Sequence, residues 1–335
     1  MREDRCMTMS VSSTKKKTSA KTRSAKNRRL SLRQRVRLII LVLLLFAAGV
    51  LCLLHYTGLI SVQDVLVKLG LADRPATRAD LEVHFIDVGQ GDSILVASQG
   101  QIMLIDSGER DDSNAVESYL IRHGIHHIDR LIVTHPHSDH IGEMAEIIYT
   151  FDVDEFMMPR IPDAYVPTTK CYEDMLNAIN VRDVDVMPPE DISFELGCCQ
   201  VDVYTSDIKD SENLNNYSLI VKVKHGNNSF LFTGDCENEE EMSLLKKGVD
   251  LKAKVLKAGH HGSSTSSSAD FLDAVDPAYA VISCGKVNDY GHPHEETVRR
   301  ISKYARQTYI TARDGTVVFV SDGDGLSVEL SGDKK

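Results

Sequence analysis

The stretch Leu131–Glu143 reads L-I-V-T-H-P-H-S-D-H-I-G-E. Within six positions it holds three histidines and one aspartate, namely His135, His137, Asp139 and His140. An apolar run precedes these residues and a helical pattern follows them, so they come at the end of a strand. Imidazole and carboxylate groups are good zinc ligands, and a catalytic zinc keeps one position for water. The stretch therefore predicts a metal centre with hydrolytic chemistry.

The four side chains fall into two pairs. His135 and His137 are two positions apart, so their rings project the same way, whereas Asp139 and His140 face a second point across the loop. Two ligand pairs at one strand end suit two neighbouring metals. Metals about 4 Å apart share a hydroxide and stabilise both the attacking and the leaving oxygen.

Two further strand ends carry additional ligands. The run Phe230–Thr233 leads into Gly234 and Asp235, and the run Val255–Leu256 leads through a glycine to the pair His260 and His261. Glycine next to a ligand lets the backbone come close to a metal. We therefore expect Asp235 to bridge two metals, and either histidine of the pair to bind one.

Short apolar runs alternate with helical patterns from Leu81 onward. Some of the runs form hairpins, and the middle, Phe151–Cys199, is looser and holds a helix at Lys170–Ile179. Strands interleaved with helices in this way predict an α/β fold with two mixed sheets packed face to face and helices outside.

Five motifs occur in one order: F-I-D-V-G-Q-G-D (Phe85–Asp92), L-I-D-S-G (Leu104–Gly108), T-H-P-H-S-D-H-I-G (Thr134–Gly142), F-T-G-D (Phe232–Asp235) and K-A-G-H-H-G-S (Lys257–Ser263). This set resembles the metallo-β-lactamase superfamily. Within it, the chain is most similar to the extracellular hydrolase domain of ComEC competence proteins and their stand-alone relatives. The resemblance covers residues 81–330 and implies a four-layer αββα sandwich with the metals at one edge of the sheets.

The resemblance also implies which residues hold two divalent metals. The first metal would be held by His135, His137 and Asp235, and the second by Asp139, His140, Asp235 and His260. His260 is favoured over His261 because similar proteins place the ligand directly after the strand and glycine. The expected metal is Zn²⁺.

One departure from the family pattern affects the first site. Most members have another histidine between the histidine loop and the bridging aspartate, and here that interval holds only His225, at a hairpin tip. Asn215–Ser218 occupies the expected region. The first site therefore lacks a nitrogen ligand, and water or an oxygen ligand fills the position. Because oxygen ligands suit manganese, Mn²⁺ is the alternative metal.

The same resemblance assigns supporting roles. Asp87 and Asp106 would orient the histidine loop without touching the metals. Asp139 would assist proton removal, and His292 would contact a substrate oxygen or donate a proton. For substrate binding, the hydroxyl-rich run that begins at Ser263 and the cation of Lys257 are the candidates.

The implied reaction is attack by a metal-bridging hydroxide on a phosphodiester. DNA is one candidate substrate, but residues 81–335 hold 22 Lys/Arg against 44 Asp/Glu, whereas nucleic-acid binders usually carry a basic surface. Cell-wall phosphorylcholine or teichoic-acid esters, and a lactam or lactone, are the alternatives. A non-catalytic binding module tethered to the membrane is the alternative of another class. No protein partner is predicted.

The N-terminal part has the opposite charge. Residues 1–37 hold 13 Lys/Arg against Glu3 and Asp4, and the next seventeen residues, Leu38–Leu54, have no polar side chain. This pattern predicts a disordered basic tail over 1–35, a transmembrane signal anchor over 36–57, a stalk over 58–80 and the hydrolase domain over 81–332. The basic flank predicts a single-pass protein with its N-terminus in the cytoplasm and the hydrolase domain outside the cell. A cleaved signal peptide and a buried core helix are the alternatives.

Overall fold

The computed structural model describes residues 79–110 and 114–331, together with Ser31, 33–34, 37–42 and Gly49. The predicted basic tail, membrane anchor and stalk fall almost entirely outside these residues. Among the described residues, no helix is both long and apolar enough to cross a membrane.

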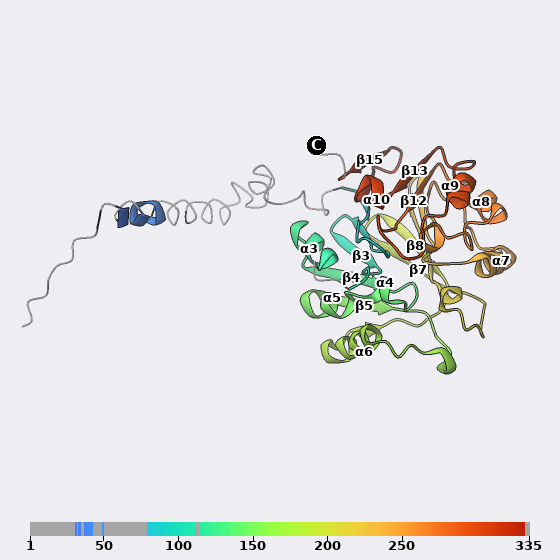
Figure 1. The fold of residues 1–335 in the computed structure, drawn as a ribbon, viewed down its shortest axis with the longest axis horizontal. Helices are drawn as coiled ribbons and strands as arrows, with labels where there is room; N and C mark the ends of the chain where they lie inside the picture. The colour runs from blue at the N-terminus through green and yellow to red at the C-terminus, as the bar shows by residue number, and fades with distance from the viewer. Residues whose placement is uncertain are drawn as a thin grey trace, which may run out of the picture. The chain divides into compact units, whose positions relative to one another are not determined.

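Two sheets form the centre of the fold (Figure 1). The first sheet has the order β15-β14-β1-β2-β3-β4-β5-β6, and the second has the order β13-β12-β11-β10-β9-β8-β7. The strands of the first sheet are β1 (Leu81–Phe85), β2 (Ile94–Ser98), β3 (Gln101–Ile105), β4 (His127–Ile132), β5 (Asp152–Met157), β6 (Asp185–Val186), β14 (Val317–Ser321) and β15 (Leu326–Leu330). Those of the second are β7 (Ile192–Leu196), β8 (Cys199–Tyr204), β9 (Ile220–His225), β10 (Asn228–Phe232), β11 (Val255–Lys257), β12 (Tyr279–Ile282) and β13 (Gln307–Ile310).

Helices cover the outer faces of both sheets (Figure 1). The helices that come after strands of the first sheet in the chain are α3 (Ala115–Arg122), α4 (Ser138–Ile141), α5 (Met144–Thr150) and α6 (Lys170–Arg182). Those that come after strands of the second sheet are α7 (Asn238–Lys247), α8 (Ala269–Val275), α9 (Glu295–Ile301) and α10 (Thr311–Asp314). Three buried apolar clusters separate the layers: one under α3, α5 and α6, one between the sheets, and one under α7, α8 and α9. The predicted αββα sandwich is therefore confirmed.

Parallel pairing sets the position of the ligand-bearing loops. In the first sheet β3, β4 and β5 are parallel, and in the second β10, β11 and β12 are parallel, so within each sheet these strands end at a common edge. The two edges meet where the Leu219 amide donates to the Thr134 carbonyl at 2.9 Å. Gly234, with φ +49°, packs against Thr134 so closely that a Cβ would lie 2.8 Å from the threonine Cβ. A side chain at position 234 would push the two edges apart.

The predicted loose middle is the main error in the sequence-based fold. Phe151–Cys199 contains strands β5, β6 and β7, and β8 begins at its end. Strand β5 has the sequence D-V-D-E-F-M and only its last two residues are buried, because β5 lies next to the short edge strand β6. With three acidic residues in six positions, the sequence lacks the apolar pattern of a strand, because only the carboxyl end of β5 is buried in the core.

Candidate metal centre

Four side chains from three loops converge on one point. Asp139, His140, Asp235 and His261 each offer a ligand atom, and these atoms all lie within 4.8 Å of one another. The histidine loop follows β4, Asp235 follows β10, and His261 follows β11. His140 Nε2 lies 3.3 Å from Asp235 Oδ1, and His261 Nε2 lies 3.1 Å from Asp139 Oδ2 and 3.3 Å from Asp235 Oδ2.

The atoms that face this point suit a cation. Within the described part of the chain, His140 Nε2, His261 Nε2 and Asp235 Oδ1 are buried and make no hydrogen bond. Their contacts are the ion-pair distances of 3.1–3.3 Å given above, and buried polar atoms that face one point without hydrogen bonds indicate a ligand there. Nitrogen and carboxylate oxygen form the donor set expected for zinc or a neighbouring divalent metal. The residues therefore fit the second metal of the predicted pair.

The other two histidines form a second pair beside Asp235. His135 Nε2 lies 3.0 Å from His137 Nδ1 and 3.9 Å from Asp235 Oδ2. His135 is fully buried and His137 partly exposed. This pair and Asp235 fit the expected first metal, and Asp235 lies between the two sets.

The charges of the two sets differ. Burial lowers the pKa of His140 and His261, but the neighbouring carboxylates together outweigh it and hold both pKa values well above the ordinary histidine value. Asp235 contributes most at both rings, helped by Asp106 at His140 and by Asp139 and Asp92 at His261. Burial together with the charge of His140 lowers the pKa of His135 and of His137. His140 and His261 therefore hold protons in the absence of metal, and metal binding must release those protons.

Asp106 supports the histidine loop from below. It follows β3 and has a left-handed backbone, with φ +59°. Its Oδ2 lies 2.8 Å from His140 Nδ1 and accepts the Thr134 hydroxyl at 2.6 Å, and its Oδ1 accepts the Thr134 amide at 2.8 Å. The carboxylate thus holds the proton on Nδ1 of His140 and leaves Nε2 free for a metal, as predicted for this position.

The carboxylate that the sequence placed with it, Asp87, lies elsewhere. Asp87 is exposed, and its Oδ1 accepts the Gly89 amide at 3.3 Å. The residue of this loop that reaches the centre is Asp92, whose Oδ1 lies 3.4 Å from His261 Nδ1. Gly91 brings the loop beneath the histidine loop, because a Cβ there would lie 2.1 Å from the Asp139 carbonyl oxygen. The G-Q-G-D turn was the signal in the sequence that pointed to Asp92.

Replacing Asp106 with asparagine tests this supporting role. An amide does not stabilise a cationic or metal-bound His140 as a carboxylate does, so we expect Asp106→Asn to weaken metal binding by about 10- to 100-fold. Calorimetric titration of the metal-free protein with Zn²⁺ measures this loss. Asp87→Asn is the matched control, and equal weakening in both variants would contradict the role of Asp106.

The histidine pair requires a correction. His261, not the favoured His260, completes the set around Asp139, His140 and Asp235. Both have left-handed backbones, with φ +45° at His260 and +51° at His261, and their ring planes lie at 70° to each other. His261 Nδ1 lies 3.0 Å from the Ser283 carbonyl oxygen, so its Nε2 faces the centre. His260 Nδ1 instead pairs with Glu237 Oε1 at 2.9 Å, and its Nε2 lies 3.7 Å from Asp235 Oδ2.

The two predicted substrate contacts are also corrected. Lys257 is fully buried, and its Nζ lies 2.5 Å from Asp92 Oδ2. Ser263 is 4% exposed, and its Oγ lies 3.0 Å from Thr265 Oγ1. Neither residue lines the pocket over the centre. Lys257 therefore acts as a buried counter-ion below the centre, because β11 has a neighbouring strand on each side.

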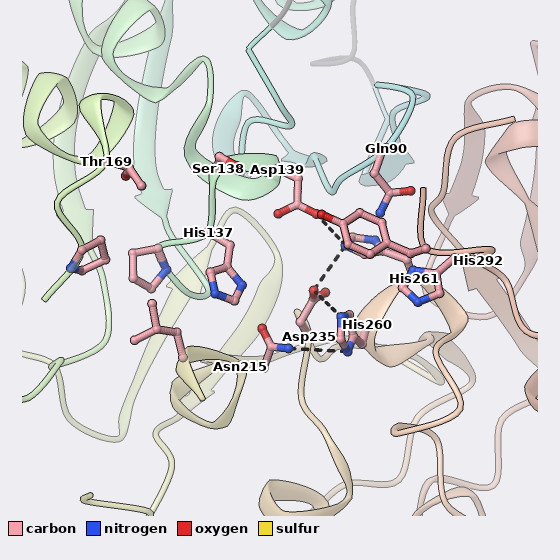
Figure 2. A pocket seen from close by; sticks show the side chains of 14 residues that line it. Gln90, His137, Ser138, Asp139, Thr169, Asn215, Asp235, His260, His261 and His292 are labelled. Carbon is pink, nitrogen blue, oxygen red and sulfur yellow. Dashed lines mark hydrogen bonds and ion pairs between the residues drawn. The ribbon is translucent and has the colours of Figure 1, made fainter. Parts of the chain in front are cut away.

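A pocket of about 300 Å³ opens over the centre (Figure 2). His137, Asp139 and His292 line it, together with His260 and Asn215. Burial first, and then the neighbouring histidines, lower the pKa of His292 to about 4, so His292 is a neutral imidazole at pH 7. A neutral imidazole has one ring N–H that can be donated to an oxygen in the pocket, which is compatible with the first of its two predicted roles.

Comparison with known proteins agrees with this geometry. Residues 86–286 match the family model described as the metallo-beta-lactamase superfamily. The chain is 27% identical over 311 residues to ComE operon protein 3 of Bacillus subtilis (strain 168), covering 83% of this chain and 39% of the relative. It is 31% identical over 296 residues to competence protein ComA of Neisseria gonorrhoeae, covering 87% and 40%. The chain thus spans about two fifths of the length of these relatives.

Among solved structures, a variant of the CmlA beta-hydroxylase has a TM-score of 0.50 at 12% identity, covering 77% of this chain and 59% of that one. This likeness concerns the fold alone.

Proposed function

The chain belongs to the metallo-beta-lactamase superfamily of metal-dependent hydrolases, and from this premise we propose that it is a membrane-anchored phosphodiesterase that acts outside the cell. The observation that carries the hydrolytic part is the convergence of Asp139, His140, Asp235 and His261 within 4.8 Å. Its fit to a divalent metal, next to the pair His135 and His137, supports a two-metal centre with Zn²⁺ or Mn²⁺.

Two divalent ions bound here supply an activated water and neutralise charge on the phosphoryl oxygens. The protein residues have separate tasks. Asp235 holds the two sets together, and Asp106 keeps His140 in the tautomer that presents Nε2. Asp139 remains partly exposed to the pocket, and although burial raises its pKa, His140 and His261 hold that pKa below the ordinary value. The ionised carboxylate accepts the proton of the attacking water. His292 orients a phosphoryl oxygen through its ring N–H.

The size and charge of the domain bear on the substrate. A pocket of about 300 Å³ accommodates a phosphodiester group and its immediate substituents. The competence proteins among the relatives keep single-stranded DNA among the candidates. The excess of Asp and Glu over residues 81–335 instead favours small or wall-bound phosphodiesters, such as phosphorylcholine or teichoic-acid links, because a DNA strand needs phosphate contacts along its length. A lactam or lactone is the remaining alternative.

The N-terminal sequence supports the proposed location. The apolar run Leu38–Leu54 follows 13 Lys/Arg, the arrangement of an uncleaved signal anchor whose basic side stays in the cytoplasm. Protease treatment of intact cells tests the location. We expect digestion of an epitope at the C-terminus and protection of one at the N-terminus, and the reverse pattern would contradict the proposal.

Turnover assays with the full-length chain in detergent test the reaction. We expect hydrolysis of bis-p-nitrophenyl phosphate in the presence of Zn²⁺ or Mn²⁺, with activity lowered about 10²-fold or more in His137→Ala and in Asp139→Ala. A panel of single-stranded DNA, plasmid, phosphorylcholine esters, a lactam and a lactone identifies the substrate class. Bound metal without turnover on any member of the panel would favour a non-catalytic binding module.

A further inference from the structure

The first metal set has three protein ligands from the expected positions and needs one more. The three ligands are His135, His137 and Asp235. The family pattern has a further histidine between the histidine loop and Asp235. In this chain that interval contains only His225, whose Nδ1 lies 2.9 Å from Ser321 Oγ. We propose that the amide oxygen of Asn215 is the remaining protein ligand of the first metal. The inference rests on the two-metal centre proposed above.

Asn215 is buried beside the centre with a free oxygen. It is 5% exposed and lines the pocket together with His137 and Asp235. Among the described residues, its Oδ1 has no hydrogen-bond partner. Figure 2 shows the amide next to Asp235 and His260, with its oxygen on the side of His137. A buried amide oxygen without a partner costs about 1–3 kcal/mol, so its retention in a pocket indicates a ligand.

The orientation of this amide follows from its partner. Asn215 Nδ2 donates to Glu237 Oε1 at 3.0 Å. An ionised carboxylate only accepts hydrogen bonds, so the nitrogen must face Glu237 and the oxygen must face away from it. Glu237 also accepts from Asn213 Nδ2 at 3.0 Å, which holds the carboxylate in place.

The backbone ties Asn215 to the bridging aspartate. Asn215 lies in a short 3₁₀ helix, η3 (Leu214–Tyr217), and its backbone N–H donates to Asn213 Oδ1 at 3.1 Å. The Ser218 hydroxyl donates to the Asn215 carbonyl at 2.8 Å and accepts the Asp235 amide at 3.2 Å. One hydroxyl therefore fixes the distance between Asn215 and Asp235, as a preformed metal site requires.

The neighbouring asparagine provides a contrast. Asn216 is 2% exposed, belongs to the same 3₁₀ helix, and donates its Nδ2 to Glu239 Oε2 at 2.8 Å. Its Oδ1 also has no partner in the described region, but Asn216 does not line the pocket. Only Asn215 combines a free oxygen with a place at the centre, and Asn216 is its matched control.

An amide oxygen changes the metal preference of the site. Imidazole suits zinc, whereas carbonyl and carboxylate oxygens suit manganese and magnesium. With Asn215 in place of a histidine, the first site has two nitrogens and two oxygens from the protein. We therefore expect the first site to bind Mn²⁺ more favourably, relative to Zn²⁺, than a site with three histidines does.

Metal titration of the full-length protein tests this assignment without a substrate. After chelation and removal of the chelator, free Mn²⁺ is followed by electron paramagnetic resonance, and Zn²⁺ binding by calorimetry. We expect Asn215→Ala to weaken Mn²⁺ binding at one of two sites by about 10-fold or more, and Asn215→His to raise the preference for Zn²⁺ over Mn²⁺ by at least a similar factor. Asn216→Ala should bind both metals as the wild type does.

The outcomes separate this inference from the proposed function. Wild-type stoichiometry and affinities for both metals in Asn215→Ala and Asn215→His would overturn the assignment of Asn215 while leaving a two-metal centre in place. A wild-type protein that binds neither metal would overturn the metal centre itself, and the assignment with it. If Asn215→Ala fails to fold, the metal preference of Asn215→His tests the assignment instead, because a histidine side chain fills the position and can still bind a metal.

Discussion

Asp235→Asn is expected to abolish metal binding at both sites and to lower hydrolysis by about 10³-fold or more. The Asp235 carboxylate lies 3.3 Å from the ring nitrogens of both His140 and His261, and 3.9 Å from that of His135. It is the group that both ligand sets share. An amide offers one neutral oxygen instead of two anionic ones, so neither set retains its full complement of donors. Metal content by mass spectrometry and turnover of bis-p-nitrophenyl phosphate measure the two effects.

The control must separate loss of ligation from loss of one negative charge. Asp87→Asn makes the same chemical change at an exposed position on a loop of the same domain, and we expect it to retain both metals and its turnover. Circular dichroism of both variants reports whether the fold persists. Retention of two metals by a folded Asp235→Asn protein would contradict the central place given to this residue.

The convergence of the site was predictable because each ligand follows a recognisable strand. Parallel strands end at a common edge within each sheet, and the resemblance to the metallo-β-lactamase superfamily implied that the metals lie at one edge of both sheets. The histidine loop after β4, Asp235 after β10 and the histidine pair after β11 were therefore expected to meet. The αββα order followed from the same alternation. In β7, the alternating sequence I-S-F-E-L was also readable, and the strand was missed because it lies within a polar region.

The errors inside the site depend on backbone geometry that no local pattern reveals. Two consecutive residues with positive φ decide that His261 and not His260 completes the set around Asp235. The close approach of Gly91 to the histidine loop decides that Asp92 and not Asp87 reaches the centre. Both facts arise from tertiary contacts. A rule that places the ligand directly after the strand and glycine therefore favoured His260, whereas His261 lies in the cluster with Asp139, His140 and Asp235.

Lys257→Met is expected to lower the free energy of unfolding by about 3–5 kcal/mol, because it removes the nearer of the two cations beside the buried Asp92 carboxylate and leaves only the His261 ring, at 3.4 Å. Lys257 Nζ lies 2.5 Å from Asp92 Oδ2, both side chains are at most 1% exposed, and Nζ also donates to the Gly234 carbonyl at 3.1 Å. Burial raises the pKa of Asp92, but the charge of Lys257 together with His261 and His140 outweighs burial, and the pKa is lowered. The pair therefore stabilises the fold above the ordinary pKa of aspartate, and this stabilisation is lost as the pH falls through the lowered value.

Urea unfolding of metal-free protein at pH 7 measures the loss, since bound metal would add its own stabilisation. Asp92→Asn in the Lys257→Met background removes the buried negative charge that has lost its lysine, so we expect the double variant to recover much of the lost free energy. Lys252→Met breaks an ion pair with Asp276 whose side chains are 73% and 71% exposed, and should leave the unfolding midpoint unchanged. Equal destabilisation in Lys257→Met and Lys252→Met, or a double variant less stable than Lys257→Met alone, would show that the buried charge of Asp92 is not the cause.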